Sequence, residues 1–280
     1  MLPTVPLRTS LAVPSGAVLT TLRLADHTTA VLDRPAAHGA RSVRPPLILI
    51  HALGLDHRSW YPVLEQLPDD RRVIAYDLRG HGLGRGATPP GSLHAFADDL
   101  AALMGHLDIE SAQVAGVSMG GAIAQTLAVD HPRLVRRLDL IAAAADPQAA
   151  YAERAASASL HGMAPQVRPT LERWFSPEFL ARDADEVRYA RESVLRALVA
   201  DWVGGWHALT KLDTRPHLPF IGVPVRLVAG GDDPTTPPAL MRGIAADLRD
   251  ARLTVVPDVR HLVSLEAPKA VATLLSADDA

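Results

Sequence analysis

One short pattern constrains this chain more than any other: Gly116, Ser118 and Gly120 stand in the spacing G-x-S-x-G. Residues 113–117 form a largely apolar run that predicts a short buried strand, and residues 122–128 suit a helix. Ser118 therefore falls on a turn from a strand into a helix. Side chains at the glycine positions would clash in such a turn, and the helix start directs free N–H groups towards the serine. We predict a nucleophilic serine here; the alternative is a glycine-rich turn with an incidental serine.

Segments with strand periodicity alternate with segments that suit helices along most of the chain. Residues 47–50 are a continuous apolar run, which is typical of a strand buried on both faces of a parallel sheet. The alternation predicts an α/β fold with a mostly parallel central sheet flanked by helices. Residues 1–17 are expected to be a proline-containing lead-in. The predicted strands are 18–24, 29–32, 47–50, 72–76, 113–117, 134–141, 225–229 and 252–256, and the predicted helices are 58–67, 93–107, 122–128, 237–248 and 262–275.

The alternation stops at residues 146–212, where no strand-like run occurs. This segment predicts several amphipathic, arginine-rich helices. We interpret it as a helical cap (lid) inserted into a core that comprises residues 1–145 and 213–280. In that interpretation the cap covers the active edge of the sheet. The alternative is a lateral extension or a second domain with no relation to the site.

Composition removes several classes of function. The chain has 280 residues, no cysteine and a net charge of -3. Disulfides and thiolate catalysis are therefore excluded, and no charge pattern points to nucleic acid or to a membrane surface. Residues 1–15 lack a basic segment followed by an apolar core, and no run approaches 18 apolar residues, so we expect neither a signal peptide nor a membrane span. We predict a cytoplasmic protein and leave its oligomeric state open.

A serine hydroxyl needs a base to accept its proton, and that base is normally a histidine oriented by a carboxylate. After a G-x-S-x-G turn the expected chain order is serine, acid, histidine. His261 lies between the last predicted strand and the last predicted helix, where ligands bind in open α/β sheets. Asp233 follows the preceding strand and is held extended by Pro234, so we choose it as the acid. Asp232 and, more distantly, Asp146 are the alternatives.

Acyl transfer also requires donors for the oxyanion that forms on the attacked carbonyl. One donor is expected from the backbone N–H of Met119, directly after the serine. The other is expected from the loop after residues 47–50, where the backbone N–H of Leu53 is best placed. These are backbone roles, so they do not depend on the side chains. We find no pattern of metal ligands and no phosphate-binding loop, and we therefore predict neither a metal nor another cofactor.

Several motifs together resemble the α/β-hydrolase superfamily over nearly the whole chain: His51–Gly54, Asp77–Gly82, the serine turn, Gly230 to Pro234, and His261. More narrowly, residues 53–60, 161–175 and 261–268 are similar to 3-oxoadipate enol-lactonases. The resemblance implies an α/β-hydrolase fold with an inserted cap. It also implies a serine hydrolase without a cofactor that cleaves a small-molecule ester or lactone, most specifically an enol-lactone-like substrate that carries a carboxylate.

Three cap residues are candidates for substrate binding. Arg173 could bind a substrate carboxylate through its guanidinium group, although a surface salt bridge would explain it equally well. Trp174 and Trp206 either line an apolar pocket or pack the cap onto the core. His51 and His81 are expected to hold their loops by hydrogen bonds.

Two other functions stay open from the sequence. One is a C–C bond hydrolase or lyase that uses the same serine, acid and histidine. The other is a ligand-binding sensor of the same fold without turnover.

Overall fold

The computed structural model describes residues 11–37 and 44–277; the first part of the predicted lead-in, residues 1–10, lies outside them. Within the described residues, eight strands form one sheet in the order β1-β2-β4-β3-β5-β6-β7-β8. The pairs β1·β2 and β2·β4 are antiparallel, and all other neighbours are parallel. The strands are β1 (Val18–Arg23), β2 (Thr28–Arg34), β3 (Leu47–Ile50), β4 (Val73–Tyr76), β5 (Ala112–Val117), β6 (Val135–Ile141), β7 (Val225–Gly230) and β8 (Ala251–Val256).

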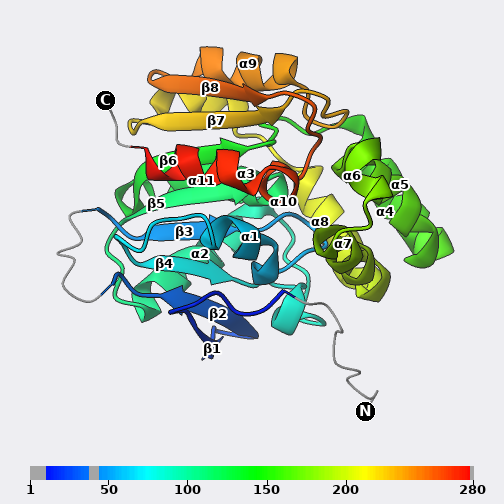
Figure 1. The fold of residues 1–280 in the computed structure, drawn as a ribbon, viewed down its shortest axis with the longest axis horizontal. Helices are drawn as coiled ribbons and strands as arrows, with labels where there is room; N and C mark the ends of the chain where they lie inside the picture. The colour runs from blue at the N-terminus through cyan, green and yellow to red at the C-terminus, as the bar shows by residue number, and fades with distance from the viewer. Residues whose placement is uncertain (1–10, 38–43, 278–280) are drawn as a thin grey trace.

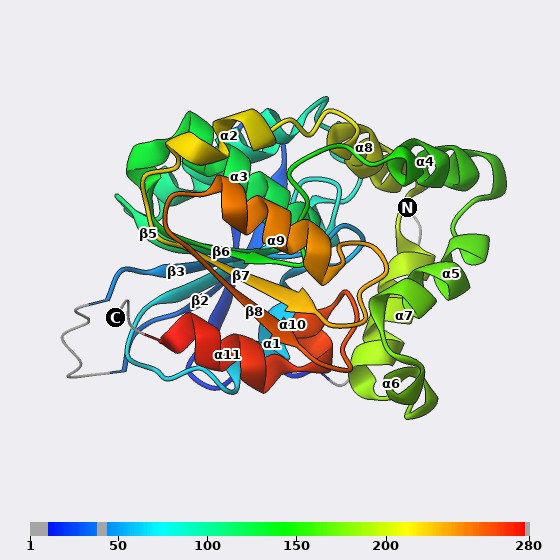
Figure 2. The same ribbon diagram turned by 90° about the horizontal axis from the view of Figure 1, so that it is seen from above.

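Helices cover both faces of this sheet, as the edge-on view of Figure 2 shows. One face carries α2 (Leu93–His106), α3 (Met119–Asp130) and α9 (Pro238–Asp247). The other face carries α1 (Tyr61–Leu64), α10 (Val263–Glu266) and α11 (Pro268–Ser276). Strands β3, β4 and β5 are buried along their whole length because helices cover them on both sides. The predicted α/β-hydrolase architecture, with its mostly parallel sheet, is confirmed.

Further helices lie between β6 and β7 in the chain and beyond the carboxyl ends of the strands in space (Figure 1). These are α4 (Ala149–His161), α5 (Ala164–Trp174), α6 (Pro177–Ala181), α7 (Asp185–Arg196) and α8 (Val199–Leu209). They occupy the place expected of a cap, whose limits at residues 146 and 212 stay a prediction. Among the described residues, no helix has both the length and the apolar character that crossing a bilayer requires.

Two predicted helices are interrupted, and proline explains both differences. The segment predicted as one helix over 58–67 is a 3-10 turn, η1 (His57–Trp60), followed by the short α1. Pro62 has no N–H and therefore fits only in the first turn of α1. The closing helix predicted over 262–275 is divided into α10 and α11, because Pro268 begins a new helix. Short 3-10 turns also occur at η2 (Gly82–Gly84), η3 (Pro132–Leu134) and η4 (Arg215–Phe220).

Candidate active site

Ser118 lies between β5 and α3 in a backbone conformation that residues other than glycine rarely adopt. Its φ is 55° and its ψ is -116°. Its N–H donates to the carbonyl of Ile141 on the neighbouring strand over 2.9 Å, and its own carbonyl accepts from Ala122 in α3 over 3.1 Å. The strand and the helix on either side therefore hold the serine in this strained turn, as the G-x-S-x-G pattern predicts.

The glycines around Ser118 permit very close contacts between backbone segments. A Cβ atom on Gly116 would lie 2.2 Å from the carbonyl oxygen of Gly120, and a Cβ atom on Gly120 would lie 2.3 Å from the carbonyl oxygen of Ile50. A Cβ atom on Gly121 would lie 2.5 Å from the methyl group of Ala143. Alanine at any of these positions would push α3 away from the sheet and move Ser118 with it.

His261 and Asp233 form a buried hydrogen bond, with 2.8 Å between Nδ1 of the histidine and Oδ2 of the aspartate. The hydroxyl of Thr236 donates to the same carboxylate oxygen over 2.6 Å, and the backbone N–H groups of Thr235 and Thr236 donate to the other oxygen. Burial raises the pKa of Asp233, but these donors and His261 lower it by more, so its pKa lies below the usual range. Asp233 is therefore an ionised acceptor that orients the imidazole ring.

The two alternative acids lie elsewhere. Asp232 is exposed to solvent, and Asp146 forms an ion pair with Arg215. Asp233 is thus the carboxylate that reaches His261.

Gly230 explains how the two loops that carry Asp233 and His261 come together. A Cβ atom on Gly230 would lie 2.1 Å from the carbonyl oxygen of Arg260 and 2.5 Å from that of Val259. The N–H of Asp232 also donates to the Val259 carbonyl over 3.0 Å. Only glycine permits this approach of the loop after β7 to the loop after β8.

Ser118 and His261 line a common cavity of about 20 Å³ between the cap and the carboxyl edge of the sheet, which we name the serine cavity. Its volume is room for about one water molecule. The structure brings all the predicted substrate-binding residues to its wall, together with both predicted oxyanion donors. The wall includes Leu53, Ser118, Met119, Arg173, Trp174, Trp206, Thr236 and His261.

The sequence did not single out Tyr151 and Arg154, both on α4, which also line the serine cavity. The guanidinium group of Arg154 lies 5.0 Å from the centroid of the Trp206 ring, and the Tyr151 ring lies 5.4 Å from Trp206. Tyr151, Ala155 and Ala158 recur at helical spacing and are buried. In the sequence, an arginine next to this apolar helix face is the feature that could have pointed to Arg154 as a cavity residue.

Two arginines therefore face the serine cavity, and their charges are not neutralised by ion pairs. Among the described residues, neither Arg154 nor Arg173 forms a salt bridge with a carboxylate; Arg173 donates to the hydroxyl of Thr170 over 2.9 Å. Burial lowers the pKa of both guanidinium groups, and the neighbouring Arg154 contributes to bringing the pKa of Arg173 to about 10. Both groups remain cationic at neutral pH, and together they favour an anion in the cavity.

The cap is bonded to the loop that carries His261. The N–H of Leu262 donates to the carbonyl of Trp174 over 3.0 Å. The carboxylate of Glu266 accepts from the N–H of Ser176 in the cap and from the N–H of Arg260 in the loop, each over 3.0 Å. A displacement of this part of the cap would therefore displace the histidine as well.

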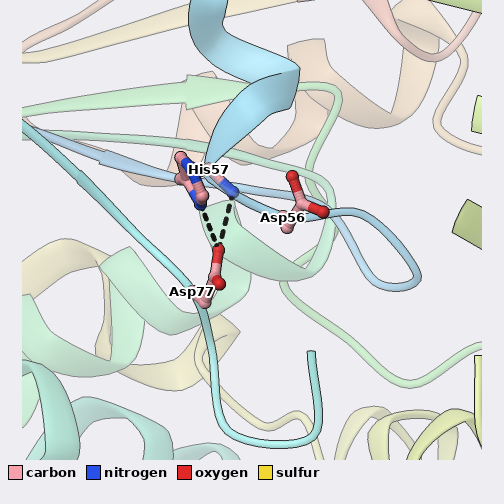
Figure 3. A group of neighbouring side chains, drawn as sticks. All are labelled: Asp56, His57 and Asp77. Atoms are coloured by element: carbon pink, nitrogen blue, oxygen red, sulfur yellow. Dashed lines mark hydrogen bonds and ion pairs between the residues drawn. The ribbon is translucent and has the colours of Figure 1, made fainter. Parts of the chain in front are cut away.

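A second group of titratable residues, Asp56, His57 and Asp77, lies close together where the segment after β3 meets the loop after β4 (Figure 3). Asp77 accepts from the ring and the backbone N–H of His57 over 2.6 and 3.0 Å, and from the N–H of Leu83 over 2.8 Å. Asp56 is bound through both oxygens by the guanidinium group of Arg58. Every carboxylate oxygen already accepts a hydrogen bond, so the group does not fit a metal ion and instead joins two loops.

Other histidines have the structural roles that the sequence predicts. The ring of His51 is fully buried, bonds to the carbonyl of Ala52 and accepts from the N–H of Leu78. Burial lowers the pKa of His51 to about 4, so its ring is neutral. His81 bonds to the carbonyl of Arg79. These bonds hold the loops after β3 and β4.

A strained serine on a strand-to-helix turn, beside a buried histidine–aspartate pair at the carboxyl edge of a parallel sheet, is typical of hydrolases of the α/β class. The family model described as alpha/beta hydrolase fold matches residues 45–268. The chain belongs to the α/β-hydrolase family.

Within this family the chain is similar to enol-lactonases. It is 29% identical to 3-oxoadipate enol-lactonase 2 of Acinetobacter baylyi over 81% of this chain and 85% of that protein. The crystal structure of the enol-lactonase from Burkholderia xenovorans LB400 superposes with a TM-score of 0.85 at 26% identity, covering 91% of this chain and 98% of the other. The (E)-2-((N-methylformamido)methylene)succinate hydrolase of A. baylyi is 26% identical over 88% of this chain and 94% of that protein.

Proposed function

We propose that the protein hydrolyses an ester or lactone by nucleophilic catalysis at Ser118. Ser118 attacks the carbonyl carbon, His261 accepts the hydroxyl proton, and Asp233 orients His261. The N–H groups of Leu53 and Met119 stabilise the oxyanion. Each such donor typically stabilises the transition state by about 2.7–4 kcal/mol. The acyl C–O bond then breaks, and His261 gives the proton to the leaving oxygen. Water gives a proton to His261 as it adds to the acyl-enzyme, the acid is released, and His261 returns the proton to Ser118. The observation that carries this proposal is the 2.8 Å bond between His261 and Asp233 beside the strained Ser118.

We further propose a small substrate that carries a carboxylate, most specifically an enol-lactone. Arg154 and Arg173 face the serine cavity, and a guanidinium group binds a carboxylate through paired N–H donors. The names of the similar proteins describe related chemistry, an enol-lactone of 3-oxoadipate and a substituted succinate. In a lactone the acyl C–O bond breaks, water supplies the new hydroxyl group, and the product is one open-chain acid.

One experiment tests the nucleophile. A fluorophosphonate should label the wild-type protein at Ser118 and leave Ser118→Ala unlabelled. Absence of label on a folded wild-type protein would favour the alternative of a binding protein without turnover. A panel of lactones, esters and β-diketones then separates ester or lactone hydrolysis from C–C bond cleavage on the same residues. A cytosolic location and independence from cofactors stay predictions.

A further inference from the structure

Cap helix α8 lies directly on the loop that carries the proposed oxyanion donor Leu53. The six-membered ring of Trp202 faces Gly54, the next residue in the chain. A Cβ atom on Gly54 would lie 2.4 Å from Cζ3 of Trp202 and 3.2 Å from Cε3. Gly54 also has a φ of 84°, which favours glycine. The indole ring therefore packs against the backbone one residue beyond Leu53, whose N–H belongs to the preceding Ala52–Leu53 peptide.

The same helix contacts both proposed oxyanion residues through a glycine. A Cβ atom on Gly205 would lie 2.7 Å from Cδ1 of Leu53 and 3.6 Å from the sulfur of Met119. Glycine at this position lets the backbone of α8 approach the two residues whose N–H groups would hold the oxyanion. Helix α8 thus forms a wall against the oxyanion hole.

Trp202 is placed by packing. Its side chain is 2% exposed, and its ring meets that of Trp206 edge-on at 5.9 Å. Among the described residues, its indole N–H has no hydrogen-bond partner. At the start of α8, Asp201 accepts from the N–H of Gly86 over 2.9 Å and joins the helix to the loop after β4. The position of α8 on the core therefore determines the position of the ring.

Residues of α8 line two cavities. The serine cavity, with Trp206 in its wall, measures about 20 Å³. A second cavity, of about 640 Å³, has Trp202, Gly54 and Leu55 in its wall. Sites that bind small molecules usually measure about 300–1,000 Å³. The serine cavity must therefore enlarge before it admits a lactone, and movement of α8 during that change would carry Trp202 away from Gly54.

We propose that Trp202 is a positioning residue for the oxyanion hole: its ring, packed on Gly54, fixes the loop backbone there and through it the orientation of the Leu53 N–H that binds the developing oxyanion. This inference rests on the proposed function. The residue acts through Gly54 and is not part of the wall of the serine cavity. Return of α8 after substrate entry restores this contact, which links closure of the cap to completion of the oxyanion hole.

The test replaces the ring and measures transition-state binding separately from substrate binding. With p-nitrophenyl acetate as the substrate, Trp202→Leu should lower kcat by roughly ten- to a hundredfold while KM changes little, since misplacement of a group by about 1 Å can cost about a hundredfold. Affinity for a trifluoromethyl ketone, which forms an oxyanion on Ser118, should fall by a similar factor. Trp202→Phe keeps an aromatic ring and should recover most of the loss.

Phe96→Leu is the matched control, because Phe96 is a buried aromatic residue on α2 that lines neither cavity. It should lower the unfolding temperature and leave kcat and inhibitor affinity at the wild-type level. An unchanged kcat and inhibitor affinity in Trp202→Leu would overturn the proposal, as would an effect on KM alone or equal losses in the Phe and Leu variants. Turnover that survives Ser118→Ala would instead overturn the proposed function, so the two failures are distinguishable.

Discussion

Arg154 lies over the face of Trp206, with 5.0 Å between its guanidinium carbon and the ring centroid, and both side chains line the serine cavity. The aromatic face stabilises the cation without neutralising it. Arg154, which lies in the cap wall of the serine cavity, thus remains available to bind an anionic ligand.

Replacing a cavity arginine should distinguish charged from neutral substrates. Arg154→Ala and Arg173→Ala should each lower kcat/KM for a carboxylate-bearing lactone by roughly ten- to a hundredfold, because a hydrogen bond to a charged group is worth about 1.5–3 kcal/mol. A neutral ester of similar size should lose little. Arg168→Ala is the control on α5, the helix of Arg173, since the Arg168 side chain is 89% exposed. Equal losses on both substrates would mean that the arginines only support the cap.

The two neighbouring aspartates should differ strongly in their effect on turnover. Asp233→Asn should lower kcat by up to about 10⁴-fold, because an amide no longer holds the histidine in the required tautomer. Asp232→Asn should have little effect, since Asp232 is exposed. Steady-state kinetics of the two variants side by side gives the comparison, and the reverse order would assign the acid to Asp232.

The backbone strain at Ser118 is expected to lower the stability of the folded protein. Its φ of 55° is strained for serine but relaxed for glycine. Ser118→Gly should therefore be more stable than Ser118→Ala by about 1 kcal/mol or more in denaturant unfolding, because a residue held in such a region costs on the order of 1–3 kcal/mol. Both variants should lack covalent labelling. Equal stability of the two would show that the turn carries no strain.

Glycine at position 230 should be required for activity. The Cβ atom of Gly230→Ala would meet two backbone carbonyls, so the loop of Asp233 must move away from that of His261. We expect a fall in kcat of at least about tenfold, in line with the cost of misplacing a reacting group, and a lower unfolding temperature. Gly243→Ala is the control, because nothing lies within 4 Å of its Cβ position in α9. Wild-type kinetics in Gly230→Ala would refute the close contact.

The His57–Asp77 pair should stabilise the fold mainly at low pH. Burial lowers the pKa of His57, but the hydrogen bond and charge of Asp77 raise it by more, so its folded pKa lies above the ordinary value. The stabilisation is then complete below the unfolded pKa of about 6.5 and is lost as pH rises through the folded pKa. The free energy of unfolding should differ between wild type and His57→Gln more at about pH 5.5 than at about pH 9. A difference that grows with pH would contradict this sign.

The sequence alone was sufficient for the α/β architecture, and it named the serine and histidine that line the serine cavity. The strand runs follow from local periodicity, and the turn at Ser118 follows from glycines whose spacing requires close backbone contact. Helix continuity was predicted less well, because Pro62 fits only in the first turn of α1 and Pro268 begins α11. These are local effects, and the sequence contains the information for them.

The sequence favoured Asp233 over Asp232 because Pro234 follows it, and in the structure Asp233 is the one of the two that meets His261. The roles of Arg154 and Trp202 needed the tertiary structure. Their positions depend on how α4 and α8 pack across loops from distant parts of the chain, at Trp206 and at Gly54. Periodicity specifies which face of a helix is buried but not which segment covers it, since many apolar partners bury a similar area.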